Sequence, residues 1–211
     1  MKKLLLMIML FLAFFSIETR AQSGGGKNMA VELSLSPFDD TKAWLTPYYL
    51  KGRAFFSDFG ARLSFGTNML FRGDQENNPE SVKNYAFFDV RPGIEYHIGA
   101  TNEAIPFVGI DFIYQMRNAN IDATVGAPIT GAWDIALLEN RGFTAIGFNI
   151  VAGGDYYIKG GNLFVGTELG FEFLRITNHE VLVGNETVAQ KTKASQFRPT
   201  LNSSIRIGIA F

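Results

Sequence analysis

From residue 28 onward, hydrophobic and polar residues alternate along the chain with a period of two. This period is typical of β-strands whose two faces meet different surroundings. The clearest stretch is 201–211, where Ile205, Ile207 and Ile209 fall on one face and Arg206 falls on the other. The same alternation predicts eight strands. They cover 28–36, 45–56, 60–72, 85–98, 104–116, 143–158, 162–174 and 201–211.

The predicted connections alternate between short and long. The short ones are tight-turn segments rich in Gly, Asp, Asn and Ser, at 57–59, 99–102 and 159–161. The longer, polar ones are 37–44, 73–84, 117–141 and 175–197. With neighbouring strands antiparallel, all the long connections lie at one end of the sheet. This asymmetry between the two ends is typical of outer-membrane barrels.

The volume of the apolar side chains indicates which face points outward. An eight-stranded barrel has an interior only just wide enough to be filled by side chains. The apolar set is bulky, with five or six large side chains on many strands, whereas the other set is rich in Gly, Ser, Asn and Ala. The bulky set therefore points outward, toward lipid. Most of the strands also exceed the ~9–11 residues that a tilted strand needs to cross a bilayer. We therefore predict an all-β fold, an eight-stranded antiparallel up-and-down transmembrane β-barrel.

The inward set contains charged residues of both signs. The predicted interior network comprises Glu32, Lys51, Arg53, Arg62, Asp89, Arg91, Glu95, Asp111, Asp155, Glu168, Glu172 and Arg206. Charges removed from water must be paired, and a set of mixed sign is able to pair. We therefore expect a closed polar interior rather than an open pore, with a narrow ion path as the alternative.

The first segment has the pattern of a cleavable export signal rather than of a folded element. Lys2 and Lys3 precede an apolar run from Leu4 to Phe15, which is too short for a transmembrane helix. Polar residues follow, and we expect cleavage after residue 21. The predicted organisation is a signal peptide over 1–21, a flexible leader over 22–27 and a β-barrel over 28–211.

The composition excludes several other classes of protein. Lys and Arg total 19 and Asp and Glu total 20, so the formal charge of −1 argues against a nucleic-acid partner. The absence of cysteine excludes a disulfide scaffold, a thiol nucleophile and cysteine metal sites. With 47% hydrophobic residues, the chain is not intrinsically disordered.

Candidate chemistry is sparse. The only two histidines are His97, on the inward set near Glu95, and His179, in a long connection. Neither stands in a His-x-Ser pairing, and a general base needs a positioned partner and a nucleophile. The acidic run 73–80 offers oxygen ligands for Ca²⁺ but lacks the EF-hand spacing. We therefore assign no catalytic residue, no metal ligand and no cofactor.

The signal peptide, the eight alternating strands and the last strand ending at Phe211 together resemble the small eight-stranded outer-membrane β-barrel family of Gram-negative bacteria, the OmpA-barrel and OmpX-like proteins. The resemblance covers 28–211. It implies an outer-membrane location, contact with outer-membrane lipid, and a terminal Phe211 that is read by the outer-membrane assembly machinery. Roles in this family are diverse, and a fold does not choose among them.

The function that we expect is non-enzymatic. It is a structural or surface-interaction role, with an extracellular partner bound through the loops 117–141 and 175–197. The alternatives are a lipid-modifying outer-membrane enzyme, a narrow channel, and a soluble periplasmic or secreted barrel.

Overall fold

A computed structural model describes residues 28–35, 47–73, 81–99, 104–123, 126–133, 141–158, 161–200 and 205–211. Within these ranges the chain forms one antiparallel sheet of twelve strands. The strands are β1 (Met29–Leu35), β2 (Pro47–Phe56), β3 (Phe59–Gly73), β4 (Ser81–His97), β5 (Ala104–Ala123), β6 (Ile129–Thr130), β7 (Phe143–Tyr157), β8 (Leu163–Asn178), β9 (Val181–Val183), β10 (Glu186–Ala189), β11 (Thr192–Thr200) and β12 (Ile205–Ala210). In the described part of the chain, no helix is both long enough and apolar enough to cross a membrane.

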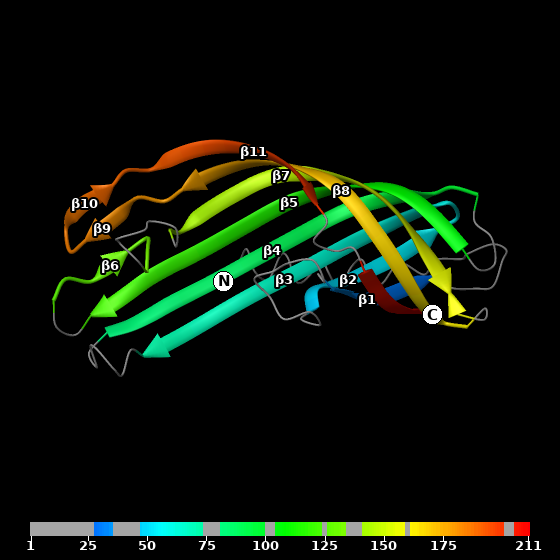
Figure 1. The fold of residues 1–211 in the computed structure, drawn as a ribbon, viewed down its shortest axis with the longest axis horizontal. Helices are drawn as coiled ribbons and strands as arrows, with labels where there is room; N and C mark the ends of the chain where they lie inside the picture. The colour runs from blue at the N-terminus through cyan, green and yellow to red at the C-terminus, as the bar shows by residue number, and fades with distance from the viewer. Residues whose placement is uncertain are drawn as a thin grey trace.

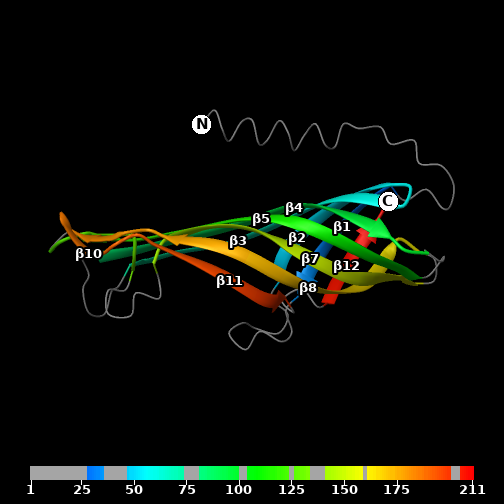
Figure 2. The same ribbon diagram turned by 90° about the horizontal axis from the view of Figure 1, so that it is seen from above.

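The sheet returns to its own first strand. β1 pairs with β2, and the pairing continues through β3, β4, β5, β7 and β8 to β12. β12 then pairs with β1 in the register Val31↔Ile209. The ends of the described chain also join, because the backbone amides of Asn28 and Met29 donate to the carbonyl of Phe211 at 3.0 Å. This ring of antiparallel pairings, seen in Figures 1 and 2, fits a β-barrel.

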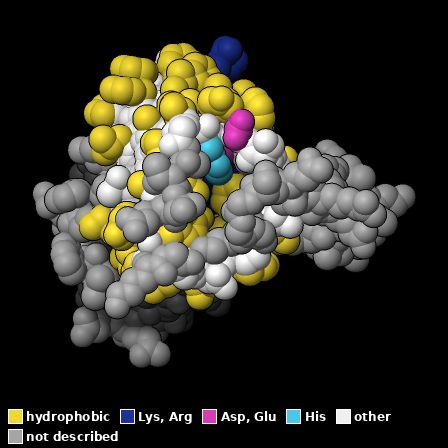
Figure 3. Space-filling view, turned by 90° about the vertical axis from the view of Figure 1, so that its right-hand side faces the viewer, with side chains coloured by type: hydrophobic (Ala, Val, Ile, Leu, Met, Phe, Trp, Pro, Cys, Tyr) yellow, Lys and Arg dark blue, Asp and Glu magenta, His cyan; other side chains and the backbone are white. Residues whose placement is uncertain are grey.

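The two faces of the ring differ as the alternation predicts. Along β8, exposed and buried residues alternate without a break from Leu163 to Arg175. The exposed face carries large apolar side chains, such as Leu169 and Phe171, which are 54% and 56% exposed. Figure 3, which views the molecule from the right-hand side of Figure 1, shows hydrophobic side chains over much of the described surface. The polar residues therefore occupy the inside.

Aromatic side chains also lie in the interior, where the alternation predicted polar and small residues. Phe164 and Tyr157 are buried and pack in a tilted arrangement with ring centroids 5.4 Å apart, together with Ala30 and Ala210. Phe107 is buried as well. These rings lie near the short-turn end of the strands, so apolar packing fills the interior there.

Several predicted boundaries are wrong at the long-connection end. The loop predicted over 175–197 instead contains the end of β8, the hairpin β9–β10 and the start of β11. The loop predicted over 117–141 contains the end of β5 and the short strand β6. In Figure 1 these segments form a sheet that extends to the left, away from the strands β1 and β12.

The ladder continues there through backbone hydrogen bonds, as β5 pairs with β6 and β6 with β9. The strands continue past the end of the apolar alternation, because backbone pairing needs no particular side chain. The predicted segments 1–21, 22–27 and 37–44 lie outside the described residues.

Candidate functional site

The twelve charged residues predicted for the interior all lie on the inner face of the ring. Each has an exposed fraction of 8% or less. They form two groups of ion pairs. The main network consists of Glu32, Lys51, Arg53, Arg62, Glu95, Asp111, Asp155, Glu168 and Arg206. The second network consists of Asp89, Arg91 and Glu172, joined by Arg198.

Arg53 on β2 is a centre of the main network. Its Nη1 contacts Asp155 on β7, and its Nε donates to Oε1 of Glu95 on β4 at 2.9 Å. A third carboxylate, Glu32 on β1, lies 3.4 Å from Nη1. One guanidinium therefore contacts carboxylates from three other strands, which its fixed array of donors allows.

Glu168 on β8 is the matching acidic centre. It accepts from Lys51 Nζ at 3.0 Å and from Arg62 Nη2 at 2.9 Å. Arg62 also binds Asp111, with Nε 2.8 Å from Oδ1. Breaking such a buried pair costs several kcal/mol, because one charge is left unneutralised. The network therefore fixes the positions of distant strands relative to one another.

An aromatic ring lies among the cations of the main network. The guanidinium carbon of Arg206 is 4.8 Å from the centroid of Phe107, and those of Arg53 and Arg62 are 5.3 and 5.8 Å away. A cation over a desolvated ring face gains about 2 kcal/mol or more. Phe107 therefore belongs to the site, although the apolar alternation gave no reason to select it.

The second network lies on the side of the long connections. Arg91 Nη2 is 2.8 Å from Asp89 Oδ2, and Arg91 Nη1 is 3.0 Å from Glu172 Oε2. Asp89 also accepts from the Tyr49 hydroxyl and from Gln115 Nε2. Tyr49 and Gln115 were missing from the predicted set.

Arg198 on β11 completes this second network, with its Nη2 2.7 Å from Glu172 Oε1. It was also missed, because it lies outside the predicted strand 201–211. Its spacing of eight residues from Arg206 places both on the same face, so the same alternation extended backwards includes it. With Arg198, the second network has two acidic and two basic members.

The main network has five acidic members and four basic ones. His97 also contacts this network, with its Nε2 2.9 Å from Glu95 Oε1. His97 also packs against the rings of Phe55 and Phe107, with centroids 5.3 and 6.5 Å away. The His97 imidazole is therefore held between a carboxylate and two aromatic rings.

His179 lies in a different environment, just beyond the end of β8. Its Nε2 is 3.1 Å from the Thr144 hydroxyl, and its backbone amide donates to the carbonyl of Gly142. Burial lowers the pKa of the His179 imidazole below its ordinary value, and the positive charges of Lys191 and Arg141 lower it further. The charges acting on this imidazole are cations, whereas a catalytic base is oriented by a carboxylate.

The structure contains no set of three or more His, Asp or Glu side chains arranged to hold a metal ion, among the residues that it describes. The predicted assembly residue Phe211 is 58% exposed, and its backbone pairs with Met29. Most of the acidic run 73–80 lies outside the described residues.

The fold and the site define an antiparallel β-ring with an ion-paired interior. No protein-family model matches the sequence, and no curated protein matches it closely enough to count as a relative. The function is therefore argued from the geometry of the chain itself.

Proposed function

We propose that the chain is an integral outer-membrane protein of the small β-barrel type. In this proposal the ring is an eight-stranded transmembrane barrel, and its role is structural or mediates surface contacts rather than catalysing a reaction. The observation that carries the proposal is the inverted distribution of polarity. Twelve charged side chains are buried inside, whereas large apolar side chains are exposed outside on strands around the ring.

The apolar side chains of the outer face form a continuous surface that is unfavourable in water. The exposed apolar side chains are contiguous, because paired strands bring Ile110, Ile150 and Phe171 into one row. Monomeric soluble proteins rarely expose apolar patches larger than a few hundred Å². A soluble barrel would also place its apolar set inside, where this chain has ion pairs. The distribution favours lipid as the surrounding medium.

The height of the apolar band suits a membrane. On β8 the outward-facing residues from Leu163 to Phe173 include no charged side chain. The whole segment 163–173 has eleven residues and spans about 33 Å along the strand, at about 3.3 Å per residue. A tilt of about 40° reduces the height to about 25 Å, which is the usual height of the apolar band on outer-membrane barrels.

The interior favours a closed barrel over a channel. Arg53, Arg62, Arg206 and Phe107 fill the space between the carboxylates of the main network, and each is at most 3% exposed. A conducting path needs water along its length, whereas these side chains bind one another. The cationic surroundings of His179 likewise favour a non-enzymatic role over lipid modification.

The sheet beyond the apolar band is the candidate region for surface contacts. It includes the ends of β3, β4 and β5, and the strands β6, β9, β10 and β11. Loops and extensions held on a rigid scaffold carry binding functions more often than the scaffold does. The expected contact regions 117–141 and 175–197 fall largely within this extension.

The proposal is tested by membrane fractionation followed by electrophoresis of matched boiled and unboiled samples. A closed membrane barrel resists SDS until it is heated, so we expect recovery with outer membranes and a change in migration on boiling. Recovery in the soluble fraction without a change in migration would overturn the proposal. Steady conductance in planar bilayers, abolished by Arg62→Ala, would favour the channel alternative.

A further inference from the structure

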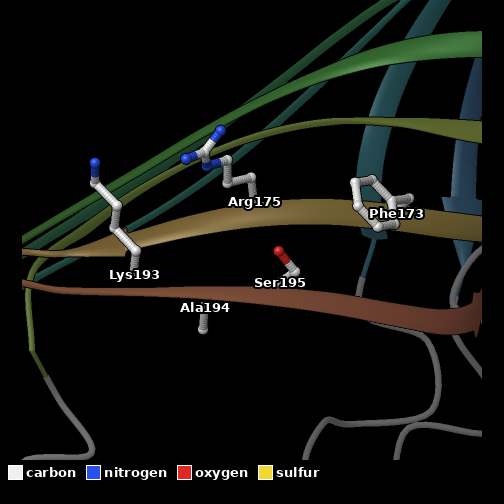
Figure 4. A pocket seen from close by; sticks show the side chains of 5 residues that line it. All are labelled: Phe173, Arg175, Lys193, Ala194 and Ser195. Atoms are coloured by element: carbon white, nitrogen blue, oxygen red, sulfur yellow. The ribbon is translucent and has the colours of Figure 1, made fainter.

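Two cationic side chains are neighbours on the outer face of the sheet, at the edge of the apolar band. Arg175 lies on β8 and Lys193 lies on β11, and the register pairs Arg175 with Ser195 and Lys193 with Thr177. The two cations are therefore diagonal neighbours on one face. Figure 4 shows both side chains pointing to the same side of the two strands as Phe173, with Ala194 on the opposite side.

Their height relative to the apolar band is well defined. Arg175 is the outward residue that follows Phe173 along β8. Across the sheet it pairs with Ile146, which in turn pairs with Tyr114. Tyrosine is typical of the level where lipid tails give way to headgroups. Arg175 is the first charged outward residue beyond the apolar band on β8, on the side of the long connections.

Neither cation has an acidic partner among the residues that the structure describes. Both side chains are exposed, although several other arginines of the chain are bound to carboxylates. Like charges that are neighbours in a sheet repel each other. An anion between them would remove that repulsion.

The surface beside the two cations is hollow. A depression of about 300 Å³ is lined by Phe173, Arg175, Lys193, Ala194 and Ser195. Directly below it, Phe173 stacks on Phe148, with ring centroids 5.6 Å apart. Phe197, which is 69% exposed, stacks on Phe171 at 5.9 Å. The site therefore combines two positive charges and a hydroxyl with an exposed aromatic surface underneath.

We propose that this site binds the phosphate of an anionic lipid headgroup in the outer leaflet. Arg175 and Lys193 neutralise the phosphate, the Ser195 hydroxyl donates to it, and the acyl chains lie along the phenylalanine rings. Guanidinium and ammonium groups both form short, strong hydrogen bonds with phosphate oxygens. The inference rests on the membrane location proposed above, because only a lipid presents its phosphate directly above apolar chains.

The test is lipid binding to the purified full-length chain in a neutral detergent, counted by native mass spectrometry. The probes are phosphatidylglycerol and phosphatidylcholine of the same chain length. The wild type is expected to retain phosphatidylglycerol preferentially. Arg175→Ser is expected to weaken that binding about tenfold, as the loss of a charge-assisted contact does, and Lys193→Ser should weaken it in the same direction.

Lys191→Ser is the matched control, because it removes an equal charge from an exposed residue outside the site. We expect this control to leave phosphatidylglycerol binding unchanged. Inorganic phosphate at the same concentration should not displace the lipid, since it makes no contact with the rings. Equal losses in Arg175→Ser and Lys191→Ser, or displacement by phosphate alone, would overturn the site.

A separate measurement distinguishes this inference from the proposed function. Each variant is refolded into phosphatidylcholine vesicles and tested for heat-dependent migration. If the wild type does not insert, the membrane proposal fails. If all variants insert and bind phosphatidylglycerol equally, only the lipid site fails.

Discussion

Arg206 and Glu32 are separated by 174 positions in the sequence, yet Nη1 of the arginine lies 3.0 Å from Oε1 of the glutamate. The same nitrogen also donates to Oε2 at 3.1 Å. These residues belong to β12 and β1, the two strands that complete the ring of pairings. A fully buried ion pair therefore joins the strands where the sheet meets itself.

Replacing Arg206 with methionine is expected to destabilise the protein strongly. The substitution leaves the carboxylates of Glu32 and Asp155 with fewer partners, and breaking a buried pair in this way costs roughly 3–5 kcal/mol. The free energy of unfolding is measured by urea titration of protein refolded into vesicles. Lys191→Met at an exposed position is the control and should change the free energy by less than about 0.5 kcal/mol.

The double variant Glu32→Gln/Arg206→Met tests the pairing itself. Because it removes both charges, it should be destabilised by less than the sum of the two single variants. Additive losses would show that the two residues act independently.

Gly153 and Gly52 are expected to respond in opposite directions to substitution by alanine. A Cβ on Gly153 would lie 2.6 Å from Phe107 Cζ and would also clash with the carbonyl oxygen of Thr167. Such overpacking costs about 1–3 kcal/mol. A Cβ on Gly52 meets nothing within 4 Å, so Gly52→Ala should be neutral or stabilising by about 0.4–1 kcal/mol. Urea unfolding compares the two, and equal losses would contradict the packing described here.

The sequence predicts the strands well where one face carries large apolar side chains. It predicts them poorly where the strands continue past that apolar face. β7 and β8 begin within a residue of their predicted starts, because the alternation is strong there. β5 was expected to end at 116 but continues to Ala123. Beyond Met116 the apolar residues change face, since Ala119 and Ile121 share the face of Asp111. The outward apolar alternation on which the prediction depended therefore ends there.

The sequence predicts the twelve charged residues of the interior, but it does not predict Arg198 and Phe107, which complete the contacts among them. All twelve charged residues lie on the face that the alternation gave them. Arg198 was missed because its strand begins in a segment without an apolar period. Phe107 was missed because a phenylalanine on the inward face is indistinguishable in sequence from an irregularity in the pattern, until the arginines around it are known.

An arginine in the middle of the apolar band should destabilise the membrane-inserted protein far more than an arginine at the edge of the band. Ile150→Arg places a charge at mid-height on β7. In a bilayer this is expected to lower the free energy of unfolding by about 2–4 kcal/mol. Thr177→Arg places the same charge beside Lys193, at the headgroup level. There the expected loss in the free energy of unfolding is only about 0–1 kcal/mol. The measurement is refolding yield and stability in vesicles. Equal stabilities for the two variants would argue against a surrounding membrane.

The region around His179 should lose stability in acid. The pKa of the folded imidazole is lowered, so its protonated form favours the locally unfolded state. The stabilising contribution is therefore present above the ordinary pKa of about 6.5, and it is lost as the pH falls from there through the lowered folded pKa. Hydrogen exchange at the amides of Gly142 and His179, corrected for intrinsic rates, should speed up between pH 7.5 and pH 5.

His179→Gln should abolish this acceleration, whereas His97→Gln should preserve it. Both substitutions remove an imidazole, but only His179 contacts this region. An acceleration that persists in His179→Gln would assign the effect to another group.

The joining of β12 to β1 also constrains the order of folding. Until β12 arrives, Glu32 and Asp155 lack the guanidinium of Arg206, and the backbone edge of β1 lacks its second partner. An incomplete sheet would therefore bury two carboxylates that share the single guanidinium of Arg53, with Lys51 also beside Glu32, and it would gain less from partial closure. Because the final contacts have the largest sequence separation, such a chain is expected to fold slowly and cooperatively, with few stable intermediates.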